Sequence, residues 1–476
     1  MFARAVTLQY SRVFIMSTIS LSNVSFSYDA SNIILDDVSV VFTDSERVAI
    51  VGDNGAGKTT VLKLLAGDIV PDSGQVSRGA SVYMTRQINA ATSKSGGERQ
   101  SAELARAFDS GAAILLLDEP TNNLDAEARR RFFNNLASYP FGAVIVSHDR
   151  ELLRLVDRII EIRQGRIRVW GGNYDFWIAG RCAEQENIFA KYTAAQKEIS
   201  RLGATMNIAQ NTRQHHEVKQ RKEIVNTRRS RIAANALKGK SQETEAKRRA
   251  IIQQKLNTQM ELRQALSTQM QDDKIKIPLP SKPFYSKELV HISGLVFGYD
   301  AATVLNNFNL VMFGGQRIRI TGRNGAGKST LLKIICGNLM PRAGRVKIFG
   351  KIAYLDQDLS LLDKNKSVVD NIVDIAGVRS HDAHVIAANF GFRGDSSKKQ
   401  VGILSGGELL KATLAAILGG ENQPDLLILD EPTNNLEIKS IAILEYALNQ
   451  YRGAILLVSH DEMFVKNIKI DYEIQI

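Results

Sequence analysis

Two segments of the chain place glycines, a lysine and a hydroxyl residue at a spacing that suits phosphate binding. Each segment follows an apolar run that predicts a buried strand and precedes one that predicts a helix. The glycines let backbone N–H groups converge on phosphate oxygens at the positive end of the helix, the lysine reaches the β- and γ-phosphates, and the hydroxyl binds Mg²⁺. The predicted phosphate-binding residues are Gly52, Asp53, Asn54, Gly55, Ala56, Gly57, Lys58, Thr59 and Thr60, and Gly322, Arg323, Asn324, Gly325, Ala326, Gly327, Lys328, Ser329 and Thr330.

An aspartate followed directly by a glutamate ends a second predicted strand in each half of the chain. We expect the aspartate beside Mg²⁺, and the glutamate can orient or deprotonate the attacking water. A third predicted strand in each half runs into Ser-His-Asp. The predicted metal ligands are Thr59, Asp118, Ser329 and Asp430, the glutamates are Glu119 and Glu431, and the histidines are His148 and His460.

These segments form two copies of one repeat. The second phosphate-binding loop follows the first by 270 residues, whereas the second histidine follows the first by 312, so the first copy lacks about 42 residues. Nearly all of this gap lies between Gln87 and Ser95, which are 8 residues apart, where Gln357 and Ser405 are 48 apart.

Taken together, the motifs resemble those of the ABC ATPase superfamily. Ser95-Gly96-Gly97-Glu98 and Ser405-Gly406-Gly407-Glu408 resemble the ABC signature, and they stand in order with the P-loops, acidic pairs and histidines, each twice. The resemblance covers 17–180 and 288–476. Two such domains, a charged linker and no membrane domain resemble the ABC-F family. By this resemblance, the segment missing from the first copy would remove most of its helical subdomain, and the short first domain is closest in layout to the antibiotic-resistance, ribosome-protection subgroup.

The resemblance implies an α/β fold in which the two domains pair head to tail, so that each ATP lies between one P-loop and the other copy's signature. One composite site would combine the Lys58 loop with Ser405, Gly406 and Gly407, and the other would combine the Lys328 loop with Ser95, Gly96 and Gly97. By the same resemblance, the predicted catalytic residues are Glu119, Glu431, His148, His460, Gln87 and Gln357.

Two further features follow from aligning the copies. Tyr28 and Tyr299 stand where the family places an aromatic ring against adenine, although a core role is the alternative for each. Glu437 stands where the first copy has Asp125, so contacts across the closed interface would differ in length by one methylene.

Residues Arg181 to Pro280 differ from both copies in composition. They hold 20 Lys and Arg against 10 Asp and Glu, in a chain of net charge +11. Apolar residues at spacings of three and four predict two helices that return on each other, with Gly239 as a candidate turn, and the apolar series of the second helix, which includes Leu256 and Met260, is the looser of the two. The alternatives for the charge are a solvated coiled-coil face and an RNA-binding tip. The predicted RNA-binding residues are Arg228, Arg229, Arg231, Lys238 and Lys240.

The expected organisation has four parts: 1–16 as an extension or a misassigned start, 17–180 as the first ABC domain, 181–280 as the helical hairpin linker, and 288–476 as the second ABC domain. Two cysteines and no long apolar run predict a cytoplasmic protein without a membrane span. We expect a monomer whose ABC domains pair within one chain.

The leading functional hypothesis is an ATPase with the cofactors ATP and Mg²⁺. By resemblance, its partner would be the ribosome, bound through ribosomal RNA near the tRNA exit site, and it would modulate translation, including by protection against antibiotics. A tandem ATPase subunit of a transporter with a separate membrane partner is the alternative. A DNA-repair ATPase is disfavoured, because two cysteines cannot supply the zinc modules such proteins insert.

Overall fold

The computed structural model describes residues 17–29, 32–85, 96–122, 124–226, 231–269, 287–300, 302–356, 359–434 and 436–476. It divides into two compact units. The first contains Met1–Trp177 and Asp273–Ile476, and so holds both phosphate-binding copies, while the second is Ile178–Asp272. Among the described helices, none is both long and apolar enough to cross a membrane.

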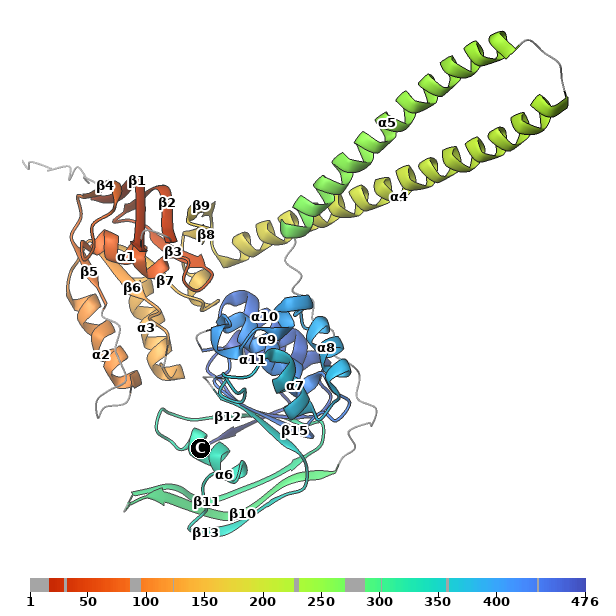
Figure 1. Ribbon diagram of the computed structural model, residues 1–476. Coiled ribbons are helices and arrows are strands. Elements are labelled where there is room, and N and C mark those ends of the chain that lie inside the picture. The colour runs from red at the N-terminus through yellow and green to blue at the C-terminus, as the bar shows by residue number, and fades with distance from the viewer. Residues whose placement is uncertain are drawn as a thin grey trace, which may run out of the picture. The chain divides into compact units, whose positions relative to one another are not determined.

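The first copy has two sheets, seen in red to orange in Figure 1. An antiparallel sheet of order β2-β1-β4 contains β1 (Thr18–Asp29), β2 (Asn32–Thr43) and β4 (Ser73–Arg78). A larger sheet has the order β5-β6-β7-β3-β8-β9, and all its neighbours are parallel except β8 and β9. Its strands are β3 (Arg47–Gly52), β5 (Val82–Met84), β6 (Ile114–Asp118), β7 (Gly142–Val146), β8 (Arg158–Arg163) and β9 (Arg166–Gly171). The helices are α1 (Lys58–Ala66), α2 (Gly96–Asp109) and α3 (Ala126–Ser138), with a 3-10 turn at Leu152–Arg154.

The second copy repeats this plan. Its antiparallel sheet has the order β11-β10-β13, and its five-stranded parallel sheet has the order β14-β15-β16-β12-β17. The strands are β10 (Glu288–Tyr299), β11 (Ala302–Phe313), β12 (Arg317–Thr321), β13 (Ala343–Ile348), β14 (Ile352–Leu355), β15 (Leu426–Asp430), β16 (Ala454–Val458) and β17 (Tyr472–Gln475). The helices are α6 (Lys328–Ile335), α7 (Val368–Ala376), α8 (Ser380–Asn389), α9 (Gly406–Leu418), α10 (Ile438–Gln450) and α11 (Glu462–Asn467), with 3-10 turns at Gly394–Lys398 and Val401–Ile403.

Continuous apolar runs explain why the strands that lead to the acidic pairs and to the histidines lie in the centre of each sheet. All five residues of β6, β7, β15 and β16 are buried, as expected for parallel strands covered on both faces. The helix after each P-loop packs in one core with both sheets, through Val61 and Leu64 of α1 and through Leu331 and Ile334 of α6. The carboxyl ends of the central strands therefore meet beside the P-loop helix.

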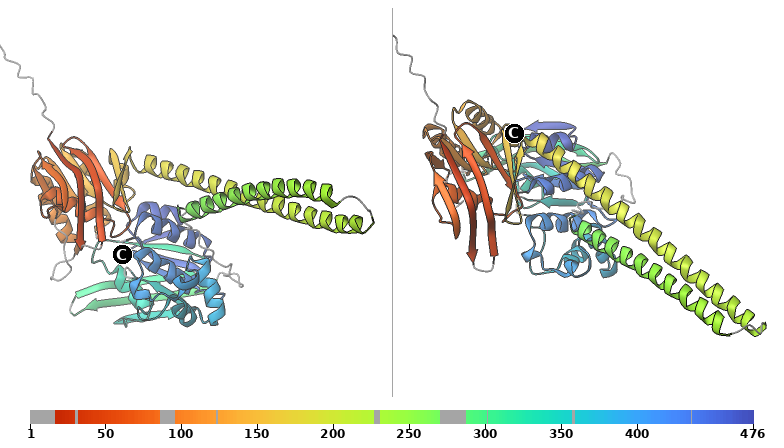
Figure 2. Two further views of the ribbon diagram at one scale, coloured as in Figure 1. Left: turned by 45° about the horizontal axis from the view of Figure 1, so that its top comes forward. Right: turned by 90° about the horizontal axis from the view of Figure 1, so that it is seen from above.

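The second unit is almost entirely helical. The helix α4 (Tyr174–Asn226) begins in the first unit, before the predicted linker start, and α5 (Arg231–Gln269) lies beside it, as all three views show (Figures 1 and 2). Ala195 and Leu202 are buried in this pair, and Arg263 Nη1 donates a hydrogen bond of 3.1 Å to Gln196 Oε1 across it.

One detail of the predicted hairpin is wrong. Gly239 lies inside α5 and is not a turn, because one glycine costs a helix only about 1 kcal/mol and good helix formers surround it. In the looser second apolar series, Met260 is 42% exposed, whereas Gln259 and Arg263 are partly buried. The buried face of a helix advances by alternating steps of three and four residues, so after Leu256 it passes through 259. The predicted α/β class, with two similar domains and a long helical segment between them, is confirmed.

Candidate functional site

The first P-loop joins β3 to α1. Gly57 has a left-handed backbone (φ 99°), and an added Cβ would lie 2.6 Å from Ile34 Cγ2, so only glycine fits this close approach. Lys58 Nζ donates to the carbonyl oxygens of Gly52 at 2.8 Å and Asp53 at 3.2 Å. Burial lowers the pKa of Lys58. The ammonium group is thus held within the loop by weak acceptors that phosphate oxygens could replace.

The second P-loop has the same geometry between β12 and α6. Gly327 has φ 103°, and its Cβ would meet Val304 Cγ1 at 2.6 Å. Lys328 Nζ donates to the carbonyl oxygens of Gly322 at 2.7 Å and Arg323 at 3.2 Å. The two cradles are therefore structural equivalents.

The predicted metal ligands meet beside each loop. Thr59 Oγ1 donates to Asp118 Oδ2 at 2.8 Å, and the Ser329 hydroxyl is hydrogen-bonded to Asp430. Within the described parts of the chain, no group of three or more His, Cys, Asp or Glu could hold a metal alone. A hydroxyl and a carboxylate suit Mg²⁺, which completes its coordination with water and substrate phosphates.

The predicted glutamates sit on a strained turn in both copies. Glu119 and Glu431 have φ 46° and 48°, a left-handed conformation that is rare for a side chain other than glycine. Each turn is held by the backbone, since Glu119 N donates to Val146 O and Glu431 N to Val458 O, both at 2.8 Å. Backbone strain of this kind concentrates at functional sites.

Each glutamate lies against the predicted histidine of its own copy. Glu119 Oε1 is 3.5 Å from His148 Nε2, and Glu431 Oε1 is 3.3 Å from His460 Nε2. Burial raises the pKa of Glu119 to about 8 and that of Glu431 to about 7. Burial also lowers the pKa of His148 to about 3 and that of His460 to about 4, so both histidines are neutral at pH 7.

Several of these buried polar atoms have no hydrogen-bond partner among the described residues. They are His148 Nε2, His460 Nε2, Asp430 Oδ1 and Glu431 Oε1. Buried polar atoms normally find partners, and the exceptions in a native protein call for a ligand or water. These atoms lie beside P-loops in which only glycine fits at Gly57 and Gly327. They are therefore suited to contact a magnesium-bound nucleoside triphosphate.

The two candidate adenine-binding tyrosines occupy equivalent positions. Tyr28 is 57% exposed and Tyr299 50% exposed, and their hydroxyl groups lie 3.3 Å from Thr60 Oγ1 and Thr330 Oγ1. A half-exposed ring anchored beside the P-loop helix has a free face for stacking, which a core residue would lack.

The P-loops also contact the other copy. Asn54 N donates to Glu437 Oε1 at 2.6 Å, and Asn324 N donates to Asp125 Oδ2 at 3.5 Å. A Cβ added to Gly406, in the second signature, would lie 4.0 Å from Asn54 Nδ2. The second signature therefore lies near the first P-loop.

Two ion pairs across the copies have opposite polarity at equivalent positions. Lys439 Nζ lies 2.8 Å from Asp53 Oδ1, and Arg323 Nη2 lies 3.8 Å from Glu127 Oε2. If two first copies or two second copies paired, like charges would face each other. The pattern therefore favours pairing of unlike copies.

The signature of the second copy begins a helix. Ser405 is the N-cap of α9 and forms a capping box with Glu408. Gly96 and Gly97 open α2 in the first copy, while Arg231, Lys238 and Lys240 belong to α5. The other predicted site residues, Gln87, Ser95, Gln357, Arg228 and Arg229, lie outside the described residues.

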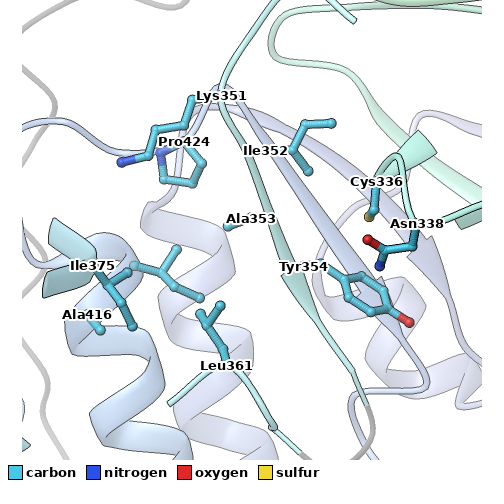
Figure 3. A pocket seen from close by; sticks show the side chains of 11 residues that line it. Cys336, Asn338, Lys351, Ile352, Ala353, Tyr354, Leu361, Ile375, Ala416 and Pro424 are labelled. Carbon is cyan, nitrogen blue, oxygen red and sulfur yellow. The ribbon is translucent and has the colours of Figure 1, made fainter. Parts of the chain in front are cut away.

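A pocket of about 320 Å³ in the second copy is separate from the P-loop (Figure 3). In that view the Tyr354 ring lies near Cys336 and Asn338. Tyr354 also donates a 3.2 Å hydrogen bond to Asp430 Oδ2, so the wall of this pocket touches a predicted metal ligand. The first copy has Met84 at the equivalent position, which offers no hydroxyl.

Two buried arginines lie beside the second histidine and belong to none of the motifs. Arg319 donates to Ser459 O at 2.9 Å and Arg129 to His460 O at 2.6 Å. Aligning the copies gives a signal that could have found them, because their counterparts are Ala49 and Ile441. A position that is charged in one copy and apolar in the other indicates that the two copies differ in role there.

Several known proteins are similar to this chain in sequence. The ABC transporter family profile matches residues 35–94 and 305–434. The chain is 30% identical over 489 residues to the ATP-binding protein Uup of Caulobacter vibrioides, covering 92% of this chain and 74% of that protein. It is 29% identical to the ABC transporter F family member 2 of Arabidopsis thaliana (95% and 76% covered) and 27% identical to the energy-dependent translational throttle protein EttA of Mycobacterium tuberculosis (91% and 87% covered).

A solved structure shares the fold. It is that of an archaeal ribosome recycling factor, aABCE1, in complex with the ribosomal stalk protein aP1, with a TM-score of 0.57 and 18% identity over 94% of this chain and 86% of that one. At this identity the likeness bears on the fold alone. The predicted architecture of two ABC ATPase domains separated by a long helical segment is confirmed.

Proposed function

The chain belongs to the ABC-F family of ATP-binding proteins with tandem ABC domains, and we propose that it hydrolyses ATP at two composite sites and thereby controls its binding to the ribosome. The observation that carries this proposal is the reciprocal contact of each P-loop with the other copy, through Asn54 and Glu437 and through Asn324 and Asp125. Because each site draws on both copies, nucleotide binding can favour the paired arrangement.

In the proposed reaction, ATP and water give ADP and phosphate. ATP supplies the phosphoanhydride bond that is cleaved, and Mg²⁺ would lower the charge on its phosphates. Lys58 and Lys328 would exchange their carbonyl partners for phosphate oxygens. Glu119 and Glu431 would accept a proton from the attacking water, which requires the ionised carboxylate.

Each neutral histidine would use its Nε2, which lies beside the glutamate without a hydrogen bond to any described residue, to orient a phosphate oxygen or the water. The glutamines Gln87 and Gln357 are proposed to complete the two catalytic sets. Thr59 with Asp118, and Ser329 with Asp430, would hold Mg²⁺. The signature residues of the opposite copy would supply further donors when the copies close.

The proposed partner is ribosomal RNA. The segment from Arg181 to Pro280 carries twice as many basic as acidic residues, 20 against 10, which favours a polyanion. A relative with 27% identity is named a translational throttle, which supports a role in translation. We propose that the basic residues near the end of the hairpin bind RNA near the tRNA exit site, and that the protein works in the cytoplasm.

Co-sedimentation with ribosomes tests the proposal. The Glu119→Gln/Glu431→Gln variant keeps the size and hydrogen bonding of both side chains but cannot accept the proton. It should pellet with ribosomes at least tenfold better in ATP than in ADP, and it should bind more weakly as salt rises. If this variant does not pellet with ribosomes in ATP at low salt, ribosome binding is ruled out, and a separate membrane partner becomes the better hypothesis.

A matched pair of variants tests the RNA contact. One replaces Arg228, Arg229, Arg231, Lys238 and Lys240 with glutamine. The control replaces five exposed basic residues of the second copy, Lys364, Arg379, Lys398, Arg452 and Lys469. Only the first should lose the ATP-dependent pelleting, and neither should change the ATPase rate without ribosomes.

A more specific form of the proposal is that the protein protects ribosomes against antibiotics. In that case the protein should restore translation in an extract inhibited by a ribosome-targeting drug, and in ATP it should release labelled drug from ribosomes. Ribosome binding without drug release would leave a general translation factor as the function.

A further inference from the structure

Arg129 stands apart from the predicted site residues, yet it touches both copies. It lies on α3, is only 7% exposed, and makes a bidentate contact with Asp149, with Nε at 3.0 Å from Oδ2 and Nη2 at 2.7 Å from Oδ1. Nη2 is also 2.9 Å from Glu151 Oε2. Its remaining nitrogen, Nη1, donates to the backbone oxygen of His460 in the second copy at 2.6 Å.

These contacts join the two histidine segments. Asp149 follows His148 directly, and its Oδ1 accepts the backbone N–H groups of Glu151 at 3.0 Å and Leu152 at 3.3 Å, so it organises the turn after His148. One planar guanidinium therefore holds the segment of His148 through a carboxylate and the segment of His460 through a carbonyl. Arginine suits this role, since its donors form a rigid fork.

The acidic side chains that follow the two histidines are a second reason for a positive charge at this place. Asp149 and Asp461 are equivalent residues of the two copies, and burial together with the charge of Asp149 raises the pKa of Asp461. Arg129 and Arg150 oppose this effect, and Arg150 pairs with Glu445 at 2.7 Å. Both arginines come from the first copy, so residues of the first copy compensate the charge of Asp461 in the second.

The second copy has no equivalent of Arg129. Its counterpart is Ile441, which is buried and cannot donate a hydrogen bond. The segment of His460 is held in addition by Arg319 of its own copy, through Ser459 O, where the first copy has Ala49. Among the described residues, the link that Arg129 makes between the histidine segments therefore has no counterpart from the second copy, although the sites are duplicated.

We propose that Arg129 is a positioning residue that couples the two nucleotide sites, by linking the His148 and His460 segments so that closure at one site places the histidine of the other. This inference rests on the proposed use of both sites. Arg129 would contact neither nucleotide, and its effect would appear as cooperativity between the sites.

Nucleotide binding in the Glu119→Gln/Glu431→Gln background tests the coupling without turnover. With Arg129 present, binding of a fluorescent ATP analogue should be cooperative, with a Hill coefficient clearly above 1. Arg129→Ile, which installs the second copy's own residue, should reduce the coefficient to about 1. Arg130→Ile is the matched control, since Arg130 is exposed on the same helix and should leave cooperativity unchanged.

A distance measurement gives an independent readout. Val70 and Met340 are equivalent residues, 79% and 84% exposed, and can carry spin labels once Cys182 and Cys336 are replaced. In the Arg129→Ile protein, the ATP-induced change in the label distance should require at least tenfold more ATP than in the Arg130→Ile protein.

A second substitution separates coupling from stability. Arg129→Ile leaves Asp149 unpaired, whereas Arg129→Ile/Asp149→Asn removes that charge and should recover the melting temperature but not the cooperativity. If the isoleucine variant does not fold, Arg129→Lys takes its place in the test. The lysine variant should keep less than half of the amount by which the Hill coefficient exceeds 1. Three outcomes would each overturn the proposal. They are recovery of cooperativity in the double variant, full cooperativity in Arg129→Ile or Arg129→Lys, and a parent protein that binds nucleotide without cooperativity. Failure of the proposed ATPase is distinct, because it would show as wild-type turnover that does not depend on Glu119 and Glu431.

Discussion

The Oε1 atom of Glu437 accepts a hydrogen bond of 2.6 Å from the backbone N–H of Asn54, 383 residues earlier in the chain. The equivalent contact, from Asn324 N to Asp125 Oδ2, is 3.5 Å long. Two differences account for this. Glutamate reaches one methylene further, and Asp125 uses its other oxygen to cap α3 through Ala128 N at 2.9 Å, whereas Glu437 makes no side-chain cap on α10.

Removing these carboxylates should therefore have unlike effects. Glu437→Ala should weaken nucleotide binding at the Lys58 site by several-fold with little change in stability. Asp125→Ala should cost about 1 kcal/mol of stability through the lost helix cap and affect nucleotide binding less. Titration with a fluorescent ATP analogue and thermal melting would check both. Equal effects of the two changes on binding would contradict this interpretation.

The two glutamates should give sites with different pH dependence. A general base works only when ionised, and kcat/KM reports the pKa of the free enzyme. With Glu431→Gln, the remaining activity should fall as the pH drops below about 8, and with Glu119→Gln below about 7. At pH 7.5 the Glu119→Gln variant should retain about threefold more activity. Superimposable profiles would argue against the assignment.

The same pKa values make a prediction about stability without nucleotide. Because the pKa of Glu119 and that of Glu431 are raised in the folded state, the folded protein holds more protons than the unfolded chain between pH 4.5 and about 8. Their contribution to stability is thus complete below pH 4.5 and is lost as the pH rises. The melting temperature of Glu119→Gln/Glu431→Gln should match wild type near pH 5 and exceed it by on the order of 5 °C at pH 9. A difference that does not change with pH would contradict the raised values.

Tyr354 allows a test of one proposed metal site alone. Its hydroxyl donates to Asp430 Oδ2, and this hydrogen bond lowers the pKa of Asp430 against the raising effect of burial. Tyr354→Phe should raise the Mg²⁺ concentration needed for nucleotide binding at the second site by roughly threefold to tenfold. Met84→Leu at the equivalent position of the first copy is the control and should have no such effect. If nucleotide binding is independent of Mg²⁺ in both proteins, the assignment of these metal ligands is wrong.

Much of the fold could be predicted because its signals are local. Buried parallel strands appear as short apolar runs, and a P-loop between a strand and a helix requires glycine at residues such as Gly57 and Gly327, where the backbone is left-handed. The duplication adds strength, since an error in one copy would break the match with the other. The prediction of the hairpin was less exact, as Gly239 shows, because a single glycine among good helix formers is too small a cost to end a helix.

The sequence by itself determined which residues could bind phosphate and metal, and that there are two such sets, because each motif is contiguous and its chemistry belongs to the residue types. Only the tertiary structure decided how the sets are joined. Arg129 carries no motif, and its role depends on Asp149 and His460, which are 20 and 331 residues away. The contacts of a buried guanidinium are fixed by three-dimensional packing, and spacing along one chain holds no record of them.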